Sequence, residues 1–170
     1  MDSLVHSTHN PGHSCYDSEK EGYMVTYKNI LFCTDFSENA QAALPFAIDL
    51  AKKYGAMFHV LHVFEEPLHV VEFEIISNTK MDWIRIGQME KKLEALCKKI
   101  TLEVGLCHSE LLRGRRAHSE IFCYAKKANI DLIVMGSHSL SGWQQVLWGS
   151  TAERVLRESP CHVLVIRRPG

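Results

Sequence analysis

Short apolar runs alternate with longer amphipathic stretches along this 170-residue chain. Five of the runs are apolar at nearly every position and rich in β-branched residues, which is typical of strands buried on both faces of a parallel sheet. We predict these strands at residues 29–34, 56–63, 107–112, 132–135 and 161–166.

A first helix is predicted between the first two strands. Ser37 is a good N-cap for it, and Gly55 is placed to end it. Pro45 lies inside this helix, where we expect it to kink the helix or remove a hydrogen bond.

The longest helix is predicted at 81–103, and two shorter ones precede the fourth and fifth strands. We assign the long helix an apolar face of Ile84, Met89, Leu93, Leu96 and Ile100. The preceding segment, 64–80, has no clean period, and either a flap or a short helix fits it. Lys91, Lys92, Lys98 and Lys99 are interpreted as a solvated helix face rather than a nucleic-acid patch.

The predicted elements alternate strictly between strand and helix. Because β-α-β crossovers are right-handed, this order predicts an α/β, Rossmann-like fold: a five-stranded parallel sheet with helices on both faces. We assign one domain to residues 27–170. Residues 1–26 are polar and contain few large aliphatic side chains, so we interpret them as a flexible N-terminal tail.

The tail also contains His6, His9, His13 and Cys15. Their spacing matches no standard zinc pattern, so we favour a solvated tail over a metal site and predict no metal ligands in this chain.

Composition narrows the class of protein further. A formal net charge of −1 provides no general attraction to nucleic acid or to an anionic membrane. No apolar run approaches the ~20 residues that span a bilayer. The six cysteines are irregularly spaced and fall mostly in apolar segments, as expected of buried thiols in a reducing cytoplasm.

The candidate site is the carboxyl edge of the predicted sheet, where the ends of strands one, two and four should meet. Gly149-Ser150-Thr151 begins a helix, and unpaired backbone N–H groups there favour an anion such as phosphate. Asp35 would accept hydrogen bonds from ligand hydroxyls.

Each of these residues also has a plain structural interpretation. Asp35 is placed to cap the first helix, and Gly136 to form a tight turn. Ser150 and Glu153 fit a capping box.

Several motifs together resemble the universal stress protein family, over residues 27–167. Ile30-Leu31-Phe32-Cys33-Thr34-Asp35-Phe36-Ser37 is similar to the family's opening strand and loop, and Val60-Leu61-His62-Val63 to its second strand. The segments 131–138, 149–156 and 159–165 are close to the family's remaining motifs.

The resemblance implies binding of ATP or another adenine nucleotide, with or without Mg²⁺. It implies that Asp35 contacts the ribose, and that Val63 and the neighbouring strand ends, Thr34 and Met135, contact the adenine. The implied phosphate-binding residues are Gly136, Ser139, Gly149, Ser150 and Thr151, and His138 would contribute when protonated.

The chain departs from the pattern of nucleotide-binding members, G-x2-G-x9-G-[ST], at one glycine. Gly136, Gly149 and Ser150 keep the spacing, but Ser139 replaces the second glycine. A serine there has a steric cost if φ is positive, whereas its hydroxyl offers a hydrogen bond to phosphate. Residues 140–148 contain no Lys or Arg, which weakens phosphate attraction.

The resemblance also implies a homodimer paired through the last strand, Cys161 to Ile166. We find no nucleophile elbow, Walker lysine motif or dinucleotide fingerprint, so we expect a binding module, with at most slow ATP hydrolysis or autophosphorylation. Two hypotheses remain. One is a cytoplasmic, dimeric nucleotide-binding stress-response module with an unknown protein partner. The other is a family member that has lost nucleotide binding and serves only as a dimeric interaction module.

Overall fold

Five strands alternate with four helices in the residues that the computed structural model describes, which are 25–66, 75–137 and 149–167. The alternation agrees with the predicted order. The elements are β1 (Asn29–Cys33), α1 (Glu38–Tyr54), β2 (Met57–Glu65), α2 (Ile75–Val104), β3 (Cys107–Gly114), α3 (Ala117–Lys127), β4 (Leu132–Gly136), α4 (Ser150–Glu158) and β5 (His162–Ile166).

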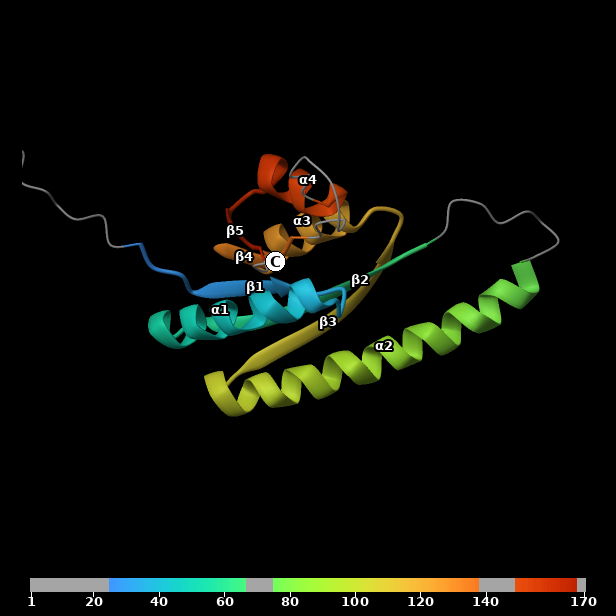
Figure 1. Ribbon diagram of the computed structural model, residues 1–170, viewed down its shortest axis with the longest axis horizontal. Helices are drawn as coiled ribbons and strands as arrows, with labels where there is room; N and C mark the ends of the chain where they lie inside the picture. The colour runs from blue at the N-terminus through green and yellow to red at the C-terminus, as the bar shows by residue number, and fades with distance from the viewer. Residues whose placement is uncertain (1–24, 67–74, 138–148, 168–170) are drawn as a thin grey trace, which may run out of the picture.

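All strand pairs are parallel, and the sheet order is β3-β2-β1-β4-β5. Helices α1 and α2 cover one face, and α3 and α4 cover the other (Figure 1). The predicted α/β, Rossmann-like fold is therefore confirmed. The direction of winding reverses between β1 and β4, and this reversal opens a crevice at the carboxyl ends of the two strands.

The long helix α2 differs from its prediction at its start and on its face. It begins at Ile75, so residues 75–80 of the segment left open above are helical, while residues 67–74 lie outside the described residues. Ile84 is 49% exposed, so its assignment to the core face was wrong. Positions three and four residues apart form the true stripe, which runs through Ile86, Met89, Leu93, Leu96 and Ile100.

Helix α1 lies close to the sheet because its inner face is made of small residues. Ala40, Ala43, Ala47 and Ala51 are buried against the side chains of β1 and β4. Ser37 caps the helix by accepting a hydrogen bond from the Ala40 N–H at 3.2 Å, as predicted. The helix continues through Pro45 to Gly55, which takes the left-handed conformation at φ 62°.

Gly136, the last residue of β4, is the point where this packing is tightest. A Cβ atom built there would lie 2.3 Å from the Asn39 carbonyl oxygen and 2.7 Å from the Ala40 nitrogen. No real Cβ approaches backbone this closely, so only glycine fits. The close approach of α1 replaces the plain tight turn that the sequence offered as one interpretation of Gly136.

A buried polar pair sits on the opposite face, between β2 and α3. His59 Nδ1 lies 2.9 Å from the Tyr124 hydroxyl, while His59 Nε2 is buried without a hydrogen-bond partner. Burial, and secondarily the charge of the neighbouring His108, lowers the pKa of His59. Burial, followed by the charge of Glu110, raises the pKa of Tyr124 to about 12.

No helix in the described part of the chain is both long enough and apolar enough to cross a membrane.

We predict that Gly136→Ala destabilises the protein by about 2 kcal/mol, because the added methyl group pushes α1 away from β4. Chemical denaturation followed by circular dichroism measures this change. Gly87→Ala, in α2, is the matched control: nothing lies within 4 Å of its built Cβ, so we expect it to stabilise by about 0.5 to 1 kcal/mol. Equal stability of Gly136→Ala and wild type would contradict the close approach.

We predict a pH-dependent contribution of His59 to stability. Its folded pKa lies below the unfolded value near 6.5, so the neutral form favours folding above pH 6.5. That stability is lost as the pH falls through the folded pKa. The difference in Tm between wild type and His59→Gln should therefore shrink between pH 7.5 and pH 5. A difference that stays constant with pH would show that His59 does not titrate differently on folding.

Candidate functional site

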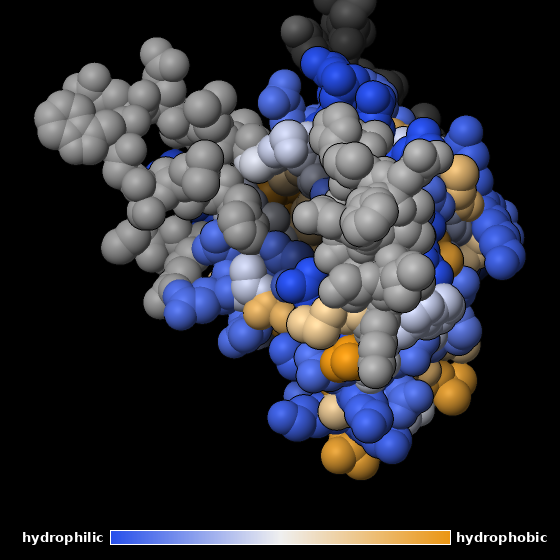
Figure 2. All heavy atoms as spheres, turned by 90° about the vertical axis from the view of Figure 1, so that its right-hand side faces the viewer, coloured by the Kyte–Doolittle hydropathy of each residue, from blue (hydrophilic) through white to orange (hydrophobic). Residues whose placement is uncertain are grey.

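A cavity of about 620 Å³ lies at the carboxyl edge of the sheet, over the ends of β1, β2 and β4. Its floor is apolar and includes Cys33, Leu61 and Met135, and α3 and α4 contribute Ile121 and Ala152 to its wall. Figure 2 looks onto this end of the molecule, where polar residues make up most of the described surface and apolar residues show between them. The position is the switch point at which parallel α/β sheets bind ligands.

Of the ten predicted site residues, eight are described and all eight line this one cavity. They come from the end of β1, the end of β2, the end of β4 and the start of α4, segments that are far apart in the sequence. The eight are Thr34, Asp35, Val63, Met135, Gly136, Gly149, Ser150 and Thr151. The other two, His138 and Ser139, lie outside the described residues, as do Trp143 and Trp148.

The loop between β1 and α1 is held by its own side chains. The Phe36 N–H donates to Thr34 Oγ1 at 3.0 Å, and the Ser37 N–H donates to Asp35 Oδ1 at 2.9 Å. These bonds stabilise the backbone of Phe36, whose φ of 62° lies in the left-handed region. That conformation costs a residue with a side chain roughly 1 kcal/mol. Asp35 therefore shapes the loop that precedes α1, whereas Ser37 caps the helix.

His62 ties the end of β2 to the same loop. Its Nδ1 lies 2.8 Å from the Thr34 carbonyl oxygen, so Nδ1 carries the proton and donates. Its ring lies 5.0 Å from the ring of Phe36, centroid to centroid. His62 thus joins the ends of β1 and β2 and holds Thr34 and Asp35 at the rim of the cavity.

Helix α4 presents its N-terminus to the cavity. Gly149 is the N-cap, its carbonyl accepts the Glu153 N–H at 3.0 Å, and as a glycine it has no side chain to cap the helix. The predicted capping box, with Ser150 as the N-cap, was therefore wrong. Ser150 is instead the first residue of the helix, and it is exposed. The backbone N–H groups of this turn form a site suited to an anion.

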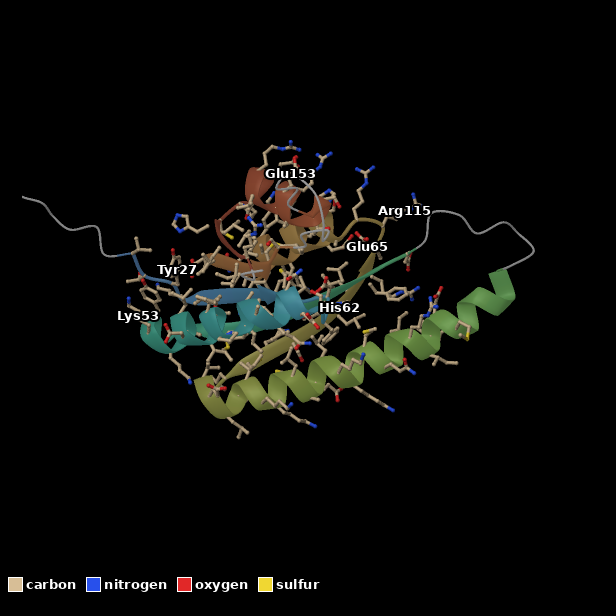
Figure 3. The ribbon with its side chains drawn as sticks, viewed as in Figure 1. Tyr27, Lys53, His62, Glu65, Arg115 and Glu153 are labelled. Atoms are coloured by element: carbon tan, nitrogen blue, oxygen red, sulfur yellow. The ribbon has the colours of Figure 1, made fainter. Side chains whose placement is uncertain are left out.

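Two contributions to the cavity were not expected from the sequence: Glu65 at the end of β2, and helix α3. Glu65, Ala117 and Ile121 all line it, because β2 and β3 extend past the ends of the other strands. Glu65 Oε1 accepts the Ala117 N–H at 2.7 Å and so caps α3. Figure 3 shows Glu65 and His62 on β2, with Arg115 on the turn that leads into α3. The signal in the sequence was the polar Gly114-Arg115-Arg116 turn before a helix.

Cys33 lies in the cavity floor. Burial, and secondarily the charge of Cys161, raises the pKa of the Cys33 thiol far above its ordinary value, so the group stays protonated at neutral pH. In the described parts of the chain, no group of three or more His, Cys, Asp or Glu side chains is arranged to hold a metal ion.

Comparison with known proteins agrees with this fold. The model of the universal stress protein family matches residues 26–167. Universal stress protein MJ0531 of Methanocaldococcus jannaschii is 35% identical over 148 residues, covering 84% of each chain.

Solved structures show the same architecture. Universal stress protein UspA from Lactobacillus plantarum superposes with a TM-score of 0.75 at 26% identity, covering 85% of this chain and all of that one. A universal stress protein family protein from Arabidopsis thaliana, with AMP bound, has a TM-score of 0.57 at 18% identity. The match covers 84% of this chain and 93% of that one, and at this identity it supports the fold only. The family model and the relatives together show that this chain belongs to the universal stress protein family.

Proposed function

We propose that the chain binds an adenine nucleotide in the cavity over β1, β2 and β4 and serves as a dimeric, cytoplasmic regulatory module. The observation that carries this proposal is the convergence of apolar strand ends, a carboxylate and an uncapped helix N-terminus in one cavity. An apolar surface suits a planar base, and the other two groups suit a sugar and a phosphate.

Each part of a nucleotide has a matching group. Val63 and Met135 offer apolar contacts to the adenine, and the Asp35 carboxylate can accept hydrogen bonds from ribose hydroxyls. The first backbone N–H groups of α4 can donate hydrogen bonds to a phosphate. Mg²⁺ would enter with the phosphates rather than on a set of protein ligands of its own.

Binding rather than catalysis suits the described lining. Cys33 is held protonated by burial, and the carboxylate of Glu65 is engaged with the N-terminus of α3. We therefore propose that any ATP hydrolysis or autophosphorylation is slow.

A cytoplasmic location is supported by the state of the sulfur atoms. The five cysteines within the described ranges are free thiols. A reducing compartment keeps thiols in this state.

The second hypothesis, an interaction module without a nucleotide, is favoured by one observation. No lysine or arginine belongs to the described lining of the cavity, so phosphate binding would rest on backbone groups. Ser139→Gly separates the two functions: gained nucleotide affinity would identify that serine as the obstacle.

We predict that Asp35→Asn weakens nucleotide binding about tenfold, because a neutral amide is a poorer acceptor for ribose hydroxyls than a carboxylate. The amide oxygen can still accept the Ser37 N–H, so the loop should keep its shape. Native mass spectrometry of protein purified without added nucleotide, then titrated with AMP and ATP, measures the occupancy.

Asp49→Asn, an exposed change on α1 outside the cavity lining, serves as the control and should bind as wild type does. If Asp35→Asn also kept wild-type affinity, the ribose assignment would be wrong. A protein that stays empty in millimolar nucleotide would favour the second hypothesis.

We propose that two copies pair through β5, which is an edge strand with half-buried side chains on both faces. The Ile166 carbonyl accepts the Ser137 N–H at 2.9 Å, so the Ile166 backbone faces β4. Because backbone groups alternate along a strand, the Val165 N–H points to the open edge. An open edge of this kind is a template for pairing with another chain.

We predict that Val165→Pro converts the dimer to a folded monomer, because it removes an outward donor and leaves the ladder to β4 intact. Light scattering after size-exclusion chromatography measures the mass. Leu164→Pro is the comparison: its N–H faces β4, so we expect it to lower Tm sharply instead. A Val165→Pro protein that remained dimeric would place the interface elsewhere.

A further inference from the structure

The described lining of the cavity has an acidic charge balance. Asp35 follows β1 and Glu65 ends β2, and both carboxylates belong to the lining. No lysine or arginine does so among the described lining residues. The intervening sequence 138–148 adds no lysine or arginine either. A phosphate group entering this cavity therefore meets two like charges.

Glu65 is fixed where it stands. Its Oε1 accepts the Ala117 N–H at 2.7 Å, and the N-cap residue of α3, Arg116, provides no side-chain cap of its own. The carboxylate of Glu65 thus occupies the N-terminus of α3, where an anion would otherwise bind. Three helices, α1, α3 and α4, contribute to the lining near their N-termini; Ser37 caps α1 and Glu65 caps α3, so the N-terminus of α4 is left for a phosphate.

Four cations on the adjoining elements have other partners, and two more are exposed outside the lining. Arg113 pairs with Glu66 at 2.8 Å and lies over the ring of Trp83 at 5.0 Å. Arg154 and Arg157, on α4, both lie 3.0 Å from Glu158. Lys92 lies over the ring of Phe36 at 5.8 Å. Arg115 and Arg116 are exposed and are not part of the lining.

One helix N-terminus stabilises one phosphate, whereas every further phosphate adds negative charge beside Asp35 and Glu65, and no lysine or arginine in the described lining offsets that charge. We propose that the cavity selects a nucleoside monophosphate over the unmodified nucleoside and over the triphosphate. This inference rests on the nucleotide binding proposed above and specifies which nucleotide class the site holds.

Isothermal titration calorimetry of the full chain with adenosine, AMP and ATP tests this selectivity. The titrations use low ionic strength and a chelator, so that the phosphates carry their full charge. We expect AMP to bind about fivefold to tenfold more tightly than ATP, and also more tightly than adenosine. Raising the salt to about 0.5 M should reduce the AMP-to-ATP ratio, because screening weakens charge repulsion.

Glu65→Gln tests the residue that carries the argument. The amide oxygen of glutamine can still accept the Ala117 N–H, so α3 keeps its cap while the charge is removed. We expect ATP affinity to rise about fivefold and AMP affinity to rise less, so that the ratio falls. Asp49→Asn is the control: it also removes one negative charge, on the exposed side of α1 and outside the lining, and should leave the ratio close to that of wild type.

The outcomes separate this inference from the function on which it rests. ATP binding as tightly as AMP, or more tightly, would overturn the selectivity and leave nucleotide binding intact. An unchanged ratio in Glu65→Gln would overturn the role of Glu65. Failure of all three ligands to bind would overturn both the selectivity and the proposed function.

Discussion

The close approach of α1 to the sheet is the constraint on which the rest of the molecule depends. Four buried alanines and the bare Cα of Gly136 let the start of the helix lie against the end of β4. β4 pairs with β1, and the winding of the sheet reverses between these two strands, so the contact seats α1 beside the switch point. The crevice at the switch point, and with it the cavity, follows from that packing.

The loop that joins β1 to α1 is strained by this geometry. Phe36 adopts a left-handed backbone conformation, and hydrogen bonds to Thr34 and Asp35 offset the strain. His62 then holds the carbonyl of Thr34 from the neighbouring strand. Strain of this kind persists where the surroundings over-determine the conformation, and here it shapes the rim of the candidate site.

Charge decides what the cavity can hold. Apolar strand ends and a helix N-terminus are generic features of such folds, and the contact between the end of β2 and the start of α3 adds the carboxylate of Glu65. A cap for one helix thereby becomes part of the electrostatic environment of a ligand. The same side chain has a structural role and a role in selectivity, which a charge-neutral substitution can separate.

The sequence by itself determined the order of elements, the parallel sheet and most of the site. Apolar runs and helix caps such as Ser37 and Gly55 act within a few residues, so local patterns reveal them. Parallel topology then brings the strand ends together, which is why Asp35, Val63 and Gly149 could be assigned to one site in advance.

Only the tertiary structure decided three further points. Ile86, rather than Ile84, faces the core, because the whole stripe of α2 sets the orientation of the helix. Gly136 is required by the backbone of a helix that lies about 100 residues away in sequence. Glu65 enters the cavity because β2 and β3 extend past their neighbours and bring it to the N-terminus of α3. Each point depends on contacts between distant segments, which the local patterns of hydrophobic and polar residues do not encode.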